Sequence, residues 1–298
     1  MNQSKRILKN NWIKKYNVKE VFLNTSLQSQ TINYLKNQSY IDYKGINKIL
    51  RINYNKYYPT GYVIEIKNKI VGFVGTLFSK RKINNKNYLY CNIHTWVVDQ
   101  SHRVASHLLF MPLLKKKCII TVLSPQNRLI KTFKKMGFKT IQMNYKIIFS
   151  NIFFSFFYKN SFQIEKKFSK IKLKLTNHDL KICKDHYNTS FIKFIILNKR
   201  NKSDFTLVIA KIVRKKKYFN VLNILYASNI HFLQKNWDSI NIEIFKVYKV
   251  FFYGQYFIKK KECLLPKKSN LSINFKRTIC VKNLPKNFMF NTIYSEAI

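Results

Sequence analysis

Hydrophobic and polar positions along the first half of the chain change from a helical spacing to an extended one near residue 60. Before that point the spacing predicts helices over residues 18–27 and 29–37, the second capped by its first residue, a serine. Residues 61–67 and 70–78 then form two runs rich in β-branched and aromatic side chains, with a short polar turn between them. Such a pair predicts an antiparallel hairpin, and after a longer polar turn a third strand is expected over residues 88–98.

Helices and strands alternate after this third strand. Pro112 is expected to kink or end the next helix, Pro125 suits the first turn of a helix, and Gly137 suits a helix C-cap. The predicted elements are a helix over residues 104–115, a strand over 118–124, a helix over 125–135 and a strand over 138–143. A meander that passes into alternating helix and strand is typical of a mixed α/β sheet, not of a helical bundle or a β-sandwich.

The second half of the chain shows a related series of elements. A helix is expected to start near Thr176, and the segment beyond residue 259 is less regular. The predicted elements are a helix over residues 180–187, strands over 191–197, 205–213 and 218–227, a helix over 229–245 and a strand over 248–253. We therefore expect a duplicated structure with one domain over residues 1–150 and a second over residues 151–298.

Length and composition limit the class of protein. The chain has 298 residues, of which 46% are hydrophobic, so it can bury a large core and is not disordered. The five cysteines include no C-x-x-C pair, which argues against a zinc ribbon or a disulfide framework, and no metal is expected. The first residues carry no apolar signal segment, so we expect a cytoplasmic location. The apolar stretch 147–158 is shorter than the roughly 20 residues of a membrane span, and a buried strand, a connector and a membrane-surface contact stay open for it.

The charge is strongly basic. Lys and Arg number 56 against 12 Asp and Glu, a formal net charge of +44. A/T-rich codons explain part of this bias, and the basic runs at 115–117, 214–217 and 259–261 read as solvated turns. No helix-turn-helix, zinc finger, aromatic RNA platform, Walker loop, G-x-S-x-G or H-E-x-x-H pattern is present, so a nucleic-acid partner is not expected. A surface short of carboxylates still attracts the phosphates of a nucleotide cofactor.

The segment from Trp96 to Ser106 is the first candidate for chemistry. A strand ends there, a short loop carries Arg103, and a helix begins with its free amides facing outward. This arrangement binds anions by geometry, although every strand-to-helix turn has such amides.

Residues 61–140 resemble the GNAT superfamily of acyl-CoA N-acyltransferases. The likeness lies in the order of the elements, in the loop Arg103-Val-Ala-Ser106-His-Leu108, and in the ending Phe133-Lys-Lys-Met-Gly137-Phe138. It implies a mixed, mainly antiparallel sheet flanked by helices, acetyl-CoA or another acyl-CoA as co-substrate, and a small amine as acceptor. The cofactor-binding residues that it implies are Val97, Val98, Asp99, Arg103, Val104, Ala105, Ser106 and His107.

A narrower likeness points to two-part bacterial members associated with surface-polysaccharide loci. It rests on Trp96-Val-Val followed by Arg103-x-x-Ser106, and on Tyr294-Ser295-Glu296 near the end of the chain. This resemblance implies a role in polysaccharide biosynthesis and an amino sugar as acceptor.

The sequence departs from the superfamily pattern at three positions. Ser106 and Leu108 replace loop glycines, which lets the backbone approach a pyrophosphate less closely. Phe133 stands where many members carry a tyrosine that protonates the departing thiolate. Either another group protonates the sulfur or the chain no longer catalyses. An active acyltransferase and a degenerate GNAT-like binding or assembly protein are therefore both open, with a basic RNA-associated protein as a third reading.

Candidate bases lie in or beside the strand-loop-helix unit. His94 and His102 carry imidazoles, a type of side chain that can accept a proton from an ammonium substrate, and Glu65 lies on the hairpin. Asp99 and His107 are further candidates, and His107 is the weaker one because it lies inside the helix. Strand alternation would place His94 with Trp96 on one face of the sheet, where packing is the alternative role.

Overall fold

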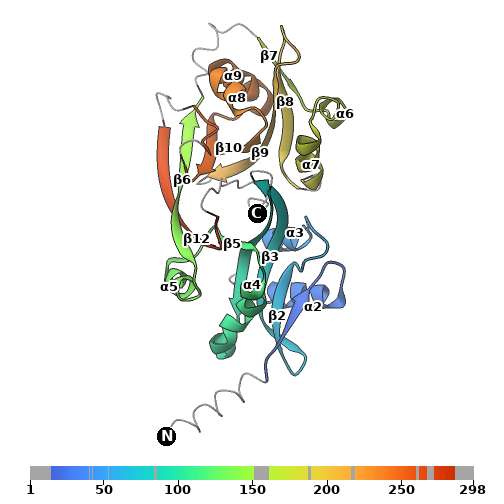
Figure 1. Ribbon diagram of the computed structural model, residues 1–298, viewed down its shortest axis with the longest axis vertical. Helices are drawn as coiled ribbons and strands as arrows, with labels where there is room; N and C mark the ends of the chain where they lie inside the picture. Colours follow the sequence, from blue (N-terminus) through green and yellow to red (C-terminus); the bar gives the residue numbers. More distant parts are fainter. Residues whose placement is uncertain are drawn as a thin grey trace. The chain divides into compact units, whose positions relative to one another are not determined.

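The computed structural model describes residues 15–39, 41, 43–52, 54–83, 86–150, 161–186, 189–215, 219–259, 262–266 and 272–285. The chain forms two compact units (Figure 1). Residues 1–141 and 278–288 make the first, and residues 142–277 form most of the second. Both units are mainly antiparallel sheets with helices packed on them, which confirms the predicted α/β class. Tyr294-Ser295-Glu296 and most of the apolar stretch 147–158 lie outside the described residues.

The first unit holds the elements up to the start of β6 and the end of the C-terminal strand. They are β1 (Asn17–Val21), α2 (Ser26–Lys36), α3 (Tyr43–Leu50), β2 (Gly61–Ile66), β3 (Lys69–Ile83), β4 (Lys86–Val98), the 3₁₀-helix η1 (Gln100–Phe110), α4 (Met111–Lys115), β5 (Ile119–Val122), α5 (Asn127–Lys135) and β6 (Lys139–Phe149). The strands lie in the order β1-β2-β3-β4-β5-β12, where β12 is the C-terminal strand Ser272–Lys282, with β4 and β5 parallel and the other neighbours antiparallel.

The predicted hairpin at residue 61 is confirmed. Lys67 and Asn68 form its turn with positive φ angles of 46° and 61°, the conformation of a two-residue turn that matches strand twist. The polar turn expected over residues 79–87 is mostly strand instead, because residues 79–83 of β3 pair with residues 86–90 of β4. Alternating side chains of a long two-stranded ribbon need not be apolar, so the polar composition of this segment was misleading.

The helix predicted over residues 18–27 is wrong. Residues 17–21 form β1 instead, which pairs antiparallel with β2 from Asn17 opposite Glu65 to Val21 opposite Gly61. Pairing with a neighbouring strand therefore overrides the short helical spacing. Helix α2 begins at Ser26, and its N-cap is Thr25, whose hydroxyl accepts the Gln28 N–H at 3.2 Å.

The second unit repeats this order of pairing. Its elements are β7 (Phe162–Glu165), α6 (Phe168–Ile171), α7 (Asn177–Asp185), β8 (Ile192–Asn198), β9 (Phe205–Lys215), β10 (Phe219–Ala227), α8 (Ile230–Lys235), α9 (Trp237–Tyr248), β11 (Phe252–Phe257) and the start of β12 (Ser272–Lys282). An antiparallel meander, β8-β9-β10, is followed by a helical crossover to the parallel strand β11, as β2-β3-β4 is followed by β5. The expected duplication is therefore visible in the pairing order.

Three details of the second unit differ from the sequence prediction. The helix expected over residues 229–245 is broken at Asn236 into α8 and α9, and α9 continues to Tyr248. The strand expected from residue 248 therefore begins only at Phe252. The C-terminal segment, expected to be irregular, contains the 11-residue strand β12.

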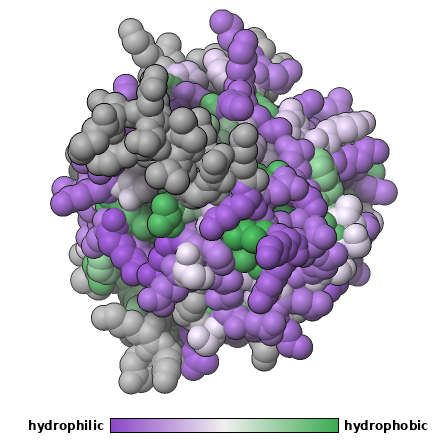
Figure 2. Space-filling model, turned by 90° about the horizontal axis from the view of Figure 1, so that it is seen from below, coloured by the Kyte–Doolittle hydropathy of each residue, from purple (hydrophilic) through white to green (hydrophobic). Residues whose placement is uncertain are grey.

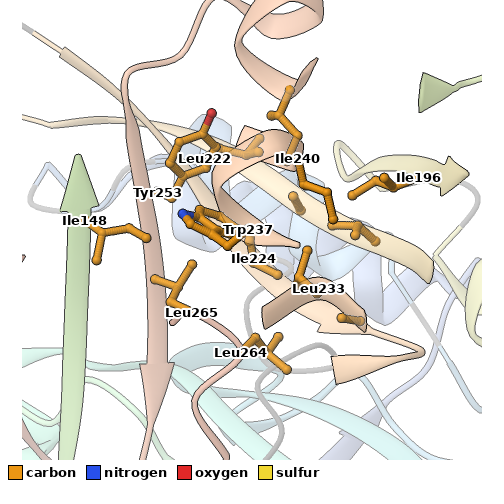
Figure 3. Packing of buried hydrophobic residues seen from close by; sticks show 14 of the residues in the cluster. Ile148, Ile196, Leu222, Ile224, Leu233, Trp237, Ile240, Tyr253, Leu264 and Leu265 are labelled. Carbon is orange, nitrogen blue, oxygen red and sulfur yellow. The ribbon is translucent and has the colours of Figure 1, made fainter. Parts of the chain in front are cut away.

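The cores lie between sheets and helices. In the first unit one cluster packs η1, α4 and α5 on the sheet, and another packs α2 and α3 on the opposite face. In the second unit, Trp237 and Ile240 of α9 pack with Ile224 of β10 and with Leu264 and Leu265 (Figure 3). Leu264 and Leu265 are held there because both amides donate to Gln255 Oε1 of β11, at 2.5 and 3.4 Å.

Three further observations concern the surface, the helices and the possible metal ligands of the described residues. Figure 2 shows a face on which hydrophilic side chains predominate and hydrophobic ones form small separate areas. None of the described helices combines the length and hydropathy that a bilayer crossing requires. In the described part of the chain, no group of three or more His, Cys, Asp or Glu side chains could hold a metal ion.

Candidate functional site

The site begins where β4 and β5 separate. The two strands pair from Tyr90 opposite Ile119 to Ile93 opposite Val122. Beyond that point β4 continues to Val98, whereas the chain after β5 turns away at Pro125 into α5. The separation opens a cavity of about 690 Å³. Its lining consists of Ile93, His94, Trp96, Val97, Val98, Arg103, Ser106, Val122, Ser124, Pro125, Gln126, Arg128, Leu129, Thr132 and Phe133.

A β-bulge in β4 stands at the cavity. Val74 of β3 pairs with Trp96 and Thr76 pairs with Ile93, so the two residues His94 and Thr95 lie opposite the single residue Gly75. The extra residue reverses the alternation of side chains along β4. Ile93 and Val98, an odd number of positions apart, consequently pack in the same core cluster.

Because Gly75 has no side chain, it leaves room for the imidazole ring of His94. A Cβ atom at Gly75 would overlap the imidazole ring of His94. The ring lies at the cavity wall, with Nδ1 3.1 Å from the Thr95 hydroxyl. Burial lowers the pKa of His94 to about 4, because desolvation disfavours the charged imidazolium. His94 is therefore uncharged at neutral pH. The opposing glycine was the sequence signal for this arrangement.

The 3₁₀ geometry of η1 decides which loop side chains reach the cavity. A 3₁₀-helix has three residues per turn, so residues i and i+3 share a face. Arg103 and Ser106 are such a pair, and both line the cavity. Leu108 lies on a different face and packs against the core cluster under η1. The bulk of Leu108 therefore does not fill the space between β4 and α5.

The other predicted cofactor residues have different surroundings. Val97 and Val98 line the cavity, whereas Ala105 is fully buried in the core. Val104 and His107 share an exposed face of η1, and His107 Nδ1 lies 3.0 Å from the Val104 carbonyl oxygen.

Asp99 connects the end of β4 to helix α2 and to the turn that follows this helix. Its Oδ1 accepts hydrogen bonds from the Tyr34 hydroxyl at 2.8 Å and from Gln38 Nε2 at 3.2 Å. The Asp99 amide donates to the Val71 carbonyl at 2.9 Å, so that amide already has an acceptor within the protein.

Two candidate bases, Glu65 and His102, lie apart from the lining. The Glu65 carboxylate is buried and forms an ion pair with Lys19 Nζ at 2.6 Å, between β2 and β1. His102 Nδ1 lies 3.3 Å from the Tyr16 hydroxyl. Of the candidate bases named from the sequence, His94 alone lines the cavity.

Aromatic rings close one side of the cavity. Phe133, from α5, lies with its ring centroid 5.7 Å from Trp96, 5.9 Å from Phe110 and 5.3 Å from Phe138. Phe133 is 1% exposed and offers no proton donor at its position on the lining. Hydroxyls do reach the lining elsewhere, from Ser106, Ser124 and Thr132.

The sequence did not predict that the turn between β5 and α5 contributes to the cavity wall. It supplies Ser124, Gln126, Arg128 and Thr132. Their signal was Pro125, which lies between the end of β5 and Gln126, the N-cap of α5; the helix predicted from residue 125 therefore begins only at Asn127. The described lining carries two arginines and no carboxylate, so the cavity is suited to an anion.

No protein-family model matches the chain, and no curated protein matches its sequence. Solved structures do match its fold. A GCN5-related N-acetyltransferase from Anabaena variabilis aligns over 89% of this chain and 72% of its own, with a TM-score of 0.56 and 13% identity. A probable N-acyltransferase from Enterococcus faecalis aligns over 89% and 71%, with a TM-score of 0.53 and 11% identity.

A third similar structure is a fungal GCN5-related glucosamine N-acetyltransferase region within a multi-domain β-N-acetylglucosaminidase. It aligns over 90% of this chain and 38% of its own, with a TM-score of 0.56 and 12% identity. The chain thus has the fold of the GNAT N-acetyltransferases, over most of its length.

Proposed function

We propose that this protein transfers an acyl group from acyl-CoA to the nitrogen of a small amine. The observation that carries the proposal is the cavity opened by the separation of β4 and β5, with Arg103 at the start of η1. The location of this cavity in a chain with the GNAT fold supports the same function. A cavity of about 690 Å³ is in the range of small-molecule and cofactor sites.

The cofactor would enter along β4. Beyond Ile93 no β5 residue pairs with β4, so the pantetheine amides can bond to the β4 main chain there. Arg103 and the first amides of η1 then hold the diphosphate, because guanidinium and helix N-terminal N–H groups both bind phosphate oxygens. Val97 and Val98 line the path between them.

The chemistry requires an uncharged amine. Its nitrogen attacks the thioester carbonyl, the C–N bond forms, and the C–S bond breaks as coenzyme A leaves as a thiolate. The uncharged His94 imidazole accepts the amine proton, directly or through water. The thiolate takes its proton from water, since Phe133 has no hydroxyl to donate.

The acyl group and the acceptor belong to the same proposal. We assign acetyl as the acyl group and an amino sugar as the acceptor, in the bacterial cytoplasm and in surface-polysaccharide biosynthesis. This assignment follows the resemblance of Trp96-Val-Val and Arg103-x-x-Ser106 to members from polysaccharide loci. The fungal glucosamine N-acetyltransferase region gives it support at the level of the fold.

Release of free coenzyme A thiol tests turnover. With acetyl-CoA and glucosamine, the wild type is expected to release thiol faster than without the amine, and His94→Phe is expected to lower kcat about 10²-fold or more. The missing tyrosine at Phe133 favours a second function, a GNAT-like protein that binds acyl-CoA without turnover. Thiol release that no amine accelerates, with acetyl-CoA binding intact, would establish that second function.

A further inference from the structure

Two arginines line the cavity, each from a helix that follows one of the two diverging strands. Arg103 belongs to η1, which follows β4, and Arg128 belongs to α5, which follows β5. Because β4 and β5 diverge, a ligand that enters between them passes both side chains. The superfamily likeness involves only Arg103, and nothing in the loop pattern requires a basic residue at position 128.

The local structure holds the Arg128 side chain in place. Its Nε donates to Gln126 Oε1 at 2.8 Å, and Gln126 also lines the cavity. With Nε used in this way, the terminal nitrogens of the guanidinium remain as donors. Among the described residues, neither Arg128 nor Arg103 forms a salt bridge.

The two arginines give the described lining a net positive charge. The described lining contains no Asp or Glu, and the first turn of α5 contains none either. Two guanidinium groups facing one cavity repel each other in the absence of an anion, and an anion between them removes that repulsion. Guanidinium donors match phosphate oxygens in bidentate geometry.

We infer that Arg128 of α5 binds a phosphate group of acyl-CoA, alongside Arg103 of η1. This inference rests on the proposed function, since it assumes that acyl-CoA occupies the cavity. It also accounts for a departure from the superfamily pattern. Ser106 replaces a glycine that would allow close backbone contact with the diphosphate, and a long side chain from α5 supplies a contact in its place.

Calorimetric titration of the full chain with three ligands tests the inference. The ligands are acetyl-CoA, its analogue without the 3′-phosphate, and S-acetylpantetheine, which has no phosphate. Arg128→Ala is expected to weaken acetyl-CoA binding about 10- to 100-fold, the usual loss for a charged hydrogen bond, and to leave S-acetylpantetheine binding unchanged. A loss confined to acetyl-CoA identifies the 3′-phosphate as the partner, and an equal loss with the 3′-dephospho analogue identifies the diphosphate.

Matched variants separate phosphate binding from general charge. Lys131→Ala removes an exposed cation from the same helix and away from the lining, so affinity should change less than twofold. Arg128→Lys keeps the charge but loses the planar fork, and an intermediate loss is expected. The midpoint of thermal unfolding should be the same in all three variants as in the wild type, because these side chains are exposed.

Two results would overturn the inference. One is unchanged acetyl-CoA affinity in Arg128→Ala, and the other is an equal loss for acetyl-CoA and for S-acetylpantetheine. If the wild type itself does not bind acetyl-CoA, the proposed function fails first. If the wild type binds acetyl-CoA and Arg128→Ala binds it with the same affinity, only the role of Arg128 is wrong.

Discussion

His94 reaches the cavity because the residue opposite it has no side chain. The bulge in β4 sets His94 and Thr95 against Gly75, and the imidazole occupies the space that a Cβ atom would take. The sequence showed both residues, but it did not show that they face each other, because strand alternation without a bulge gives a different pairing. His94 was named as a base from its chemistry, and its packing against Gly75 could be seen only in the structure.

Gly75→Ala is expected to displace the imidazole of His94. The methyl group must push the ring away, so the free energy of unfolding should fall by about 1–3 kcal/mol, the usual range for overpacking, and kcat should fall with little change in acetyl-CoA affinity. Gly72→Ala is the control in the same strand, because a Cβ there lies 3.1 Å from the nearest Val98 atom and needs a smaller adjustment. Equal effects of the two variants would contradict the role given to Gly75.

The depressed pKa of His94 predicts a pH dependence of stability. The folded value is about 4 and the ordinary value is 6.5, so between these pH values the unfolded state binds more protons. Stability from this group is therefore complete above pH 6.5 and declines by at most about 1.4 kcal/mol per pH unit toward pH 4. The free energies of unfolding of the wild type and of His94→Phe, measured in urea, should therefore depend differently on pH between pH 4 and 6.5. Parallel curves would show that His94 is not buried uncharged.

The 3₁₀ form of η1 explains why this loop can line the cavity although its sequence departs from the superfamily pattern. The replacement of a loop glycine by Leu108 suggested a blocked cavity, yet the 3₁₀ periodicity directs Leu108 into the core and leaves Arg103 and Ser106 on the cavity side. The sequence identified the strand-loop-helix order and the Gly137 ending. It could not reveal the helix type, because the apolar spacing from residue 104 fits an ordinary α-helix.

Leu108→Gly is accordingly expected to harm stability without improving binding. Removal of a partly buried leucine from the core cluster, together with a glycine in a helix, should cost about 1–4 kcal/mol in the free energy of unfolding. Acetyl-CoA affinity measured by calorimetry should not increase. Tighter binding by Leu108→Gly would instead mean that Leu108 obstructs the diphosphate.

For the whole molecule, the first unit depends on the end of the chain. Strand β12 pairs with β5, from Cys280 opposite Val122 to Lys282 opposite Ile120, and Lys282 Nζ donates to the Met136 carbonyl at 2.7 Å. The sequence predicts an irregular segment here, because a strand whose partner lies about 160 residues earlier has no local signal. The division of function at residue 150 stays a prediction, whereas the duplicated pairing order is visible in both units.

A fragment of residues 1–150 should therefore be less stable than the first unit within the full chain. Without β12, the β5 edge and its buried neighbours, among them Ile120 and Val122, are exposed. We expect a lower thermal midpoint and a tendency to associate, measured by calorimetry and sedimentation. A control fragment joined through a flexible linker to residues 272–285 should recover part of the stability. A fragment 1–150 as stable as the full chain would contradict this dependence.

The proposed function requires that the cavity between β4 and α5 binds acyl-CoA, and titration calorimetry of the full chain with acetyl-CoA measures this binding. Saturable binding with one site per chain is expected, and Arg103→Ala should weaken it about 10- to 100-fold. Binding should be unchanged by Arg51→Ala, which removes an exposed arginine away from the cavity. The absence of binding heat, or equal affinity in the wild type and Arg103→Ala, would contradict binding in this cavity.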